Sequence, residues 1–172
     1  MPVPLDDVRA VIESAKARET GGFLALIRSR FPDASDAHQQ ELAERALGII
    51  EEIPLLMEQA HRTARGRDVE ALVEPVLAHA ARYFLAPIDA IPEMTQGLAG
   101  LIDDAYFVLH ILELIDGGPT RLSAVDLAGR AAFLRELLGP RMTEQLNRTT
   151  EHAVEAVSES VTQVWNALAR PA

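Results

Sequence analysis

Apolar residues recur along almost the whole chain at the three- and four-residue spacing of an α-helix. In the first segment Leu5, Val8, Ile12 and Ala15 share one face, and later segments repeat this pattern between breaks at glycine and proline. The strict alternation typical of half-buried β-strands does not occur. We therefore predict an all-α fold. With their capping residues, the predicted helices span 5–18, 23–31, 35–66, 68–84, 98–116, 123–138 and 142–169.

Local signals place the ends of these helices. Ser35 and Asp68 each precede an apolar run and are expected to be N-caps, because their side-chain oxygens can accept from free N–H groups. Ser123 with Asp126 resembles a capping box. Pro54 lies inside an otherwise regular helical pattern, so it either kinks one helix or starts a second one.

The 172 residues fit a single domain, 1–172, since domains commonly hold roughly 100–200 residues. We expect a helical bundle of about seven helices, with a central antiparallel helical hairpin formed by the segments around 68–116. Long terminal helices such as 142–169 often pack on a partner. A homodimer or another protein partner is therefore expected.

Composition excludes several classes of protein. Sixteen basic residues against 26 acidic ones give a net charge of −10, which opposes binding to nucleic acid or to an anionic membrane. The absence of cysteine excludes disulfides, thiol catalysis and thiolate metal sites, and it fits a cytoplasmic location. No apolar run approaches the ~20 residues of a membrane span. Phosphate-loop, dinucleotide and serine-hydrolase motifs are also missing.

One stretch carries an unusual charge pattern. Between Arg82 and Arg121 there is no lysine or arginine, although the stretch is among the most apolar parts of the chain. At about 100° per residue, Tyr106 falls on the same narrow helical strip as three polar side chains of this stretch. Those three are Asp103, His110 and Glu113, and the other acids of the stretch are Asp89, Glu93, Asp104 and Asp116.

Two interpretations of these acids remain open. In one, they bind a divalent cation, since carboxylates suit Mg²⁺ and Ca²⁺ and an added imidazole favours Mn²⁺, Fe²⁺ or Zn²⁺. In the other, they form a solvated helix face, with the two aspartates stabilised near a helix N-terminus. Arg82 is the nearest cation that could pair with these two aspartates across the hairpin. The candidate metal ligands are Asp89, Glu93, Asp103, Asp104, His110 and Glu113.

A proline-rich turn precedes the acidic helix. Pro87 and Pro92 each restrain the residue before them to extended backbone. Asp89, between the two prolines, can accept from nearby backbone N–H groups and so hold the turn. A structural role for Asp89 is therefore an alternative to metal binding.

The segment Tyr83-Phe-Leu-Ala-Pro-Ile-Asp-Ala-Ile-Pro-Glu93, followed by Gly97-Leu-Ala-Gly-Leu-Ile-Asp-Asp-Ala105, resembles the YkvA-like bacterial domain of unknown function (domain of unknown function 1232). The resemblance covers about residues 75–115 and departs from the family pattern at Ala86 and at Glu93, where serine and aspartate are usual. It implies a helical hairpin in a bacterial protein, and it implies no reaction. The matching motif positions are Tyr83, Pro87, Asp89, Ile91, Pro92, Glu93, Asp103 and Asp104.

Three functional hypotheses follow. The first is a non-enzymatic interaction or regulatory domain built around the acidic hairpin, with no cofactor. The second is a divalent-metal-binding protein or a metal-dependent enzyme that uses the hairpin carboxylates. The third is a peripheral membrane protein that attaches through the apolar hairpin.

Overall fold

The computed structural model describes residues 2–85, 97–117 and 125–170, and in these ranges it contains helices and no strand. The all-α prediction is therefore confirmed. The elements are α1 Leu5–Arg18, α2 Gly22–Arg30, α3 Asp36–Arg65, α4 Glu70–Leu85, the 3₁₀-helix η2 Gly97–Leu101, α5 Ile102–Asp116, α6 Leu127–Leu138 and α7 Pro140–Leu168.

Several predicted helix ends are confirmed. The Ser35 hydroxyl caps α3 by accepting from the backbone N–H of His38 at 3.3 Å. Pro54 lies within a continuous α3, so the alternative of a new helix at this point is wrong. Gly139 separates α6 from α7 with a φ of 77°, a left-handed value that favours glycine, and Pro140 opens α7.

Two predicted caps are corrected. Asp68 has a φ of 56°, in the left-handed region that short polar residues tolerate, and α4 begins at Glu70. The N-cap of α6 is Asp126, whose carboxylate accepts from the Gly129 N–H at 2.9 Å. Ser123, the predicted start of the capping box, lies outside the described residues.

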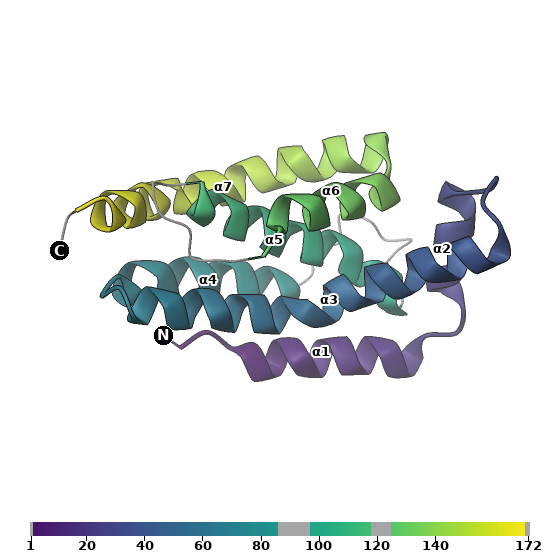
Figure 1. Cartoon of the computed structure of the whole chain (residues 1–172), viewed down its shortest axis with the longest axis horizontal. Helices are drawn as coiled ribbons and strands as arrows, with labels where there is room; N and C mark the ends of the chain where they lie inside the picture. The colour runs from purple at the N-terminus through teal and green to yellow at the C-terminus, as the bar shows by residue number, and fades with distance from the viewer. Residues whose placement is uncertain (1, 86–96, 118–124, 171–172) are drawn as a thin grey trace.

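The longer helices stack in layers along one long axis, and α2 lies across this axis near the start of α3 (Figure 1). α1 covers one side of α3 and α4, while α5, α6 and α7 lie on the other side. α4 and α5 pack on each other and run in opposite directions, which is the arrangement of the predicted central hairpin. α5 also contacts α3, α6, α7 and η2, and most of its residues are buried. It is the central helix of the bundle.

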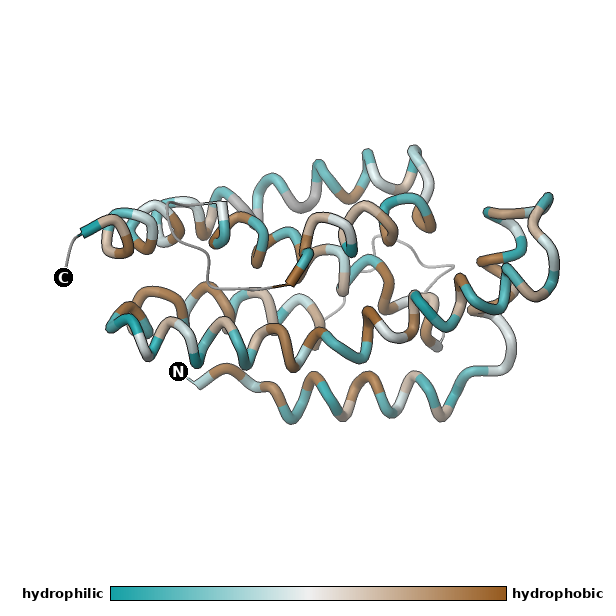
Figure 2. The backbone as a smooth tube through the Cα atoms, in the orientation of Figure 1, coloured by the Kyte–Doolittle hydropathy of each residue, from teal (hydrophilic) through white to brown (hydrophobic). Residues whose placement is uncertain are grey.

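One hydrophobic core includes side chains from every α-helix and from η2. Figure 2 shows brown and teal positions alternating along the helices. The apolar stripe of α7 is buried within the chain through Leu146, Val157, Val161 and Val164. Leu55, with 48% of its surface exposed, is the one large apolar side chain that is exposed in the described part.

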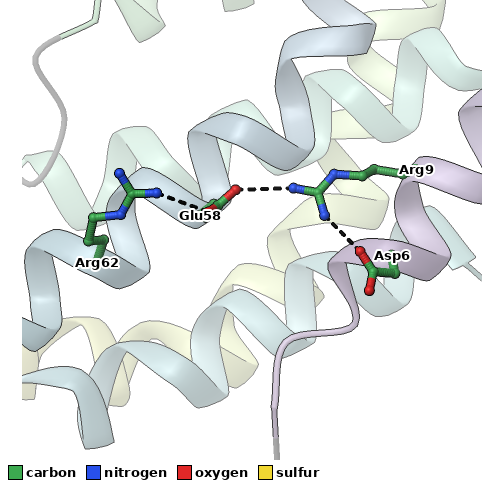
Figure 3. Close-up of polar contacts among 4 residues, drawn as sticks. All are labelled: Asp6, Arg9, Glu58 and Arg62. Atoms are coloured by element: carbon green, nitrogen blue, oxygen red, sulfur yellow. Dashed lines mark hydrogen bonds and ion pairs between the residues drawn. The ribbon is translucent and has the colours of Figure 1, made fainter.

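Ion pairs connect α1 to the outer face of α3. The Arg9 guanidinium contacts the Asp6 carboxylate at 2.8 Å and the Glu58 carboxylate at 3.1 Å, and Arg62 contacts Glu58 at 2.9 Å (Figure 3). Exposed ion pairs of this kind each contribute about 0–1 kcal/mol, so they orient α1 while the core supplies most of the stability. Among the described helices, none combines the length and the apolar character needed to span a bilayer.

Candidate functional site

The 3₁₀-helix that leads into α5 is positioned by a carboxylate from the N-terminal part of the chain. Glu19, just after α1, accepts through Oε1 from the N–H groups of Gly21 and Phe23, at 2.8 and 3.0 Å. Through Oε2 it accepts from the Leu98 N–H at 3.1 Å. Gly97 has a φ of 69°, and a Cβ at this position would lie 2.8 Å from Glu19 Oε2. One carboxylate thus joins the first turns of α2 and η2.

These hydrogen bonds change the acidity of Glu19. Burial alone would raise its pKa, but the hydrogen bonds from Phe23, Leu98 and Gly21 favour the charged form. The net effect lowers the pKa of Glu19 below its ordinary value. The sequence offered no sign of this role, because Glu19 stands outside every predicted helix.

Asp103 and Asp104 lie in the first turn of α5, directly after η2. Asp104 is only 5% exposed, and Asp103 is half-buried. Their Oδ1 and Oδ2 atoms, respectively, are buried and have no hydrogen-bond partner among the described residues. Arg82 is exposed and pairs with neither carboxylate, contrary to the pairing considered from the sequence.

Burial and proximity make both aspartates weak acids. Burial raises the pKa of Asp103 to about 6, against the opposing hydrogen bonds from its own and the Asp104 backbone N–H. Burial also raises the pKa of Asp104 to about 8, with a further contribution from the neighbouring charge of Asp103. Above neutral pH the pair therefore carries negative charge, and no described residue forms an ion pair with it.

An aromatic cluster packs α4 against α5 next to the aspartates. The rings of Tyr83 and Phe107 lie 3.8 Å apart, and the His79 ring lies 5.6 Å from Tyr83. Burial raises the pKa of the Tyr83 hydroxyl. Burial, followed by the charge of Arg82, lowers the pKa of His79. Tyr83 thus holds the hairpin together through its ring.

The remaining candidate ligands on α5 lie further along the helix. His110 Nδ1 is 3.9 Å from Glu113 Oε2, so these two side chains are brought together. His110 lies seven positions after Asp103, which corresponds to about 10 Å along the axis. Between them Tyr106 is buried, with its hydroxyl 3.4 Å from Asn147 Oδ1. Of the predicted strip, the structure thus brings His110 and Glu113 together and leaves Asp103 apart from them, beside Asp104 in the first turn of α5.

The proline-rich turn cannot be placed in this geometry. Residues 86–96 lie outside the described residues. They include the predicted ligands Asp89 and Glu93 and the motif residues Pro87, Ile91 and Pro92. Their proposed roles stay predictions from the sequence.

In the comparisons with known proteins, only the segment of the α4–α5 hairpin gives a match. Residues 76–109 match the model of a family described as "Protein of unknown function (DUF1232)", which confirms the resemblance for about a fifth of the chain. The match begins within α4 and ends within α5, and it includes Tyr83, Asp103 and Asp104. No curated protein and no solved structure gives a significant match.

Proposed function

We propose that this chain, which carries a DUF1232 segment, is a non-enzymatic binding domain that responds to a divalent cation held by Asp103 and Asp104. The observation that carries the proposal is the environment of Asp104. Its side chain is 5% exposed, and its Oδ2 has no hydrogen-bond partner among the described residues. A buried carboxylate without a partner is costly unless it is protonated, paired with a cation or bound to a metal.

A divalent cation meets the needs of this site better than a protein cation. Two adjacent carboxylates offer oxygen ligands, which Mg²⁺ and Ca²⁺ prefer, and one such ion balances both charges. Asp103 is only half-buried, so one of the two carboxylates is accessible from solvent. The sequence adds Asp89 and Glu93 as candidate further ligands from the segment before η2.

The location of the pair favours regulation over catalysis. α5 is the central helix and packs on α3, α4, α6 and α7. A change in charge at its first turn therefore acts on the stability of the whole bundle. Occupancy of the site would be transmitted as a change in the packing of the α4–α5 hairpin.

Calorimetry and thermal unfolding in Mg²⁺, Ca²⁺ or Mn²⁺ test the proposal at pH 8. At a cation concentration 100 times the Kd, binding should add about 2.7 kcal/mol to the free energy of unfolding. Asp104→Asn should abolish the added stability.

Asp7→Asn is the matched control for this experiment. Asp7 is the third residue of α1, as Asp104 is the third residue of α5, but Asp7 is exposed. This variant should keep the full response to the cation. Absence of heat and of a Tm shift in the wild-type protein would refute the cation site and leave a protonated structural pair.

A further inference from the structure

A second group of potential metal ligands lies where α3 turns into α4. His61, in the last turns of α3, faces Glu70 and Glu74 from the start of α4. His61 Nε2 is 3.0 Å from Glu70 Oε1 and 3.8 Å from Glu74 Oε2. One ligand atom from each residue lies within 4.8 Å of the other two. Among the described residues, this is the one group of three that meets this criterion.

The contact between His61 and Glu70 has the distance of a hydrogen bond but not its alignment. Nε2 is buried and has no hydrogen-bond partner within the described part of the chain, in spite of the 3.0 Å separation. The nitrogen therefore faces two carboxylates without a well-directed N–H between them. A cation between the three residues would be bound by one nitrogen and two carboxylate oxygens.

The two distances from His61 Nε2 are compatible with ligands of a tetrahedral ion. Zn²⁺ binds histidine nitrogen and carboxylate oxygen at about 2.0–2.2 Å, which places neighbouring ligand atoms about 3.4 Å apart at a tetrahedral angle. The observed 3.0 and 3.8 Å lie on either side of that value. The three side chains are 24–30% exposed, so the site is sheltered but open to an ion from solvent.

In the structure, the guanidinium of Arg65 supplies the positive charge next to Glu70. Its Nη2 is 2.6 Å from Glu70 Oε1, the oxygen atom that His61 also faces, and its Nε contacts both oxygens of Glu70. The Arg65 side chain is 69% exposed. The pair is exposed to solvent, so an ion can compete with the guanidinium for Glu70.

From this geometry we infer that His61, Glu70 and Glu74 form a binding site for a zinc-class transition ion. The mixed nitrogen and oxygen donors suit Zn²⁺, and Co²⁺ can replace it as a spectroscopic probe. Three protein ligands leave a fourth position for water. The ion would link the end of α3 to the start of α4 across the turn at 66–69, and this site is separate from the aspartate pair.

Titration of metal-free protein with Co²⁺, followed by displacement with Zn²⁺, tests this inference. The wild-type protein should develop visible absorption bands from bound Co²⁺. It should bind one ion more tightly than any further ion. H61Q should lose the bands and weaken Zn²⁺ binding at least tenfold, and E74Q should weaken it in the same direction. R65Q should bind Zn²⁺ as tightly as the wild type or several-fold more tightly, because a competitor for Glu70 is removed.

Two controls make the result decisive. H152Q removes an exposed histidine 3.6 Å from the single carboxylate of Glu155, and it should bind Zn²⁺ as the wild type does. D104N should also keep Zn²⁺ binding, which separates this site from the one at the start of α5. Thermal unfolding in chelator identifies any variant that has lost its fold, and E74Q replaces H61Q in that case. Absence of Co²⁺ bands, or their persistence in both H61Q and E74Q, would overturn the inference.

Discussion

The Glu19 carboxylate accepts a hydrogen bond from the backbone N–H of Leu98 at 3.1 Å, across 79 positions of the sequence. The same carboxylate holds the first turn of α2 through Gly21 and Phe23. Glu19 therefore fixes where η2 starts, and η2 leads directly into the aspartates of α5. The candidate site depends on a residue that lies far outside the family segment.

Replacement of Glu19 should destabilise the bundle. Glu19→Ala leaves three backbone N–H groups without their acceptor, and the expected loss is about 1–3 kcal/mol in the free energy of unfolding. Urea denaturation followed by circular dichroism measures it. Glu13→Ala is the control, since Glu13 is exposed and contacts only Lys16 on the surface of α1. Equal midpoints for the two variants would contradict the role assigned to Glu19.

The aspartate pair should make stability fall as the pH rises. The folded-state pKa values of about 6 and about 8 exceed the ordinary value of 3.8, so the folded chain keeps protons that the unfolded chain releases. Stability from these groups is complete below about pH 4 and is lost as the pH rises through 6 and 8. Unfolding midpoints in urea, measured without divalent cations between pH 5 and pH 8.5, should therefore decrease.

Asp104→Asn separates this effect from other titrations. The lowered pKa of His79 acts in the opposite sense, because stability from a depressed histidine is lost as the pH falls. Since His79 is present in both proteins, its effect cancels in the comparison. Asp104→Asn should be more stable than the wild type by about 1–3 kcal/mol at pH 8.5, and the difference should shrink at pH 5. A variant less stable than the wild type at pH 8.5 would show that the charged carboxylate is compensated.

Trp165 should stabilise the C-terminal end of α5. Its indole Nε1 donates to the carbonyl oxygens of Leu114 and Ile115, at 3.1 and 3.0 Å, and these carbonyls belong to the last turn of the helix. Trp165→Phe keeps an aromatic ring but removes the donor, so a loss of about 1 kcal/mol is expected. Chemical denaturation by circular dichroism measures this, with the exposed neighbour replaced in Asn166→Ala as control. No difference between the two variants would mean that the indole N–H is dispensable.

The elements that local patterns control were predicted well. Ser35 marks a helix start because capping acts within a few residues. The last helix begins at Pro140, two residues before the predicted position 142, because proline suits the first turn of a helix. The helical spacing also left Asp104 off the polar strip that holds Asp103, and Asp104 is buried. Asp68 was assigned wrongly, because its side chain type suits both an N-cap and a left-handed turn, and the packing of α3 on α4 selects the turn.

The contacts between distant segments could not be predicted in the same way. His61 had no ligand spacing within its own helix, and its approach to Glu70 depends on the angle at which α4 leaves α3. The Glu70–Glu74 spacing on one helical face was the available signal, but a pair of glutamates four residues apart is common on solvated helices. Glu19 gave no signal, because its partners are backbone N–H groups that any sequence offers.

Protons and a divalent cation should compete for Asp103 and Asp104. The stabilisation by the cation should therefore depend on pH, which is not expected if the pair is purely structural. Since both folded-state pKa values are raised by burial, each carboxyl must lose its proton before it can bind the ion. The rise in Tm on adding Mg²⁺ or Mn²⁺ should therefore be small at pH 5 and should grow toward pH 8.5, opposing the loss of stability expected without the ion. Asp104→Asn should remove this pH-dependent gain, and Asp7→Asn should retain it. A cation effect that is independent of pH would place the bound ion elsewhere on the acidic surface and would remove the main support for a regulatory site at the start of α5.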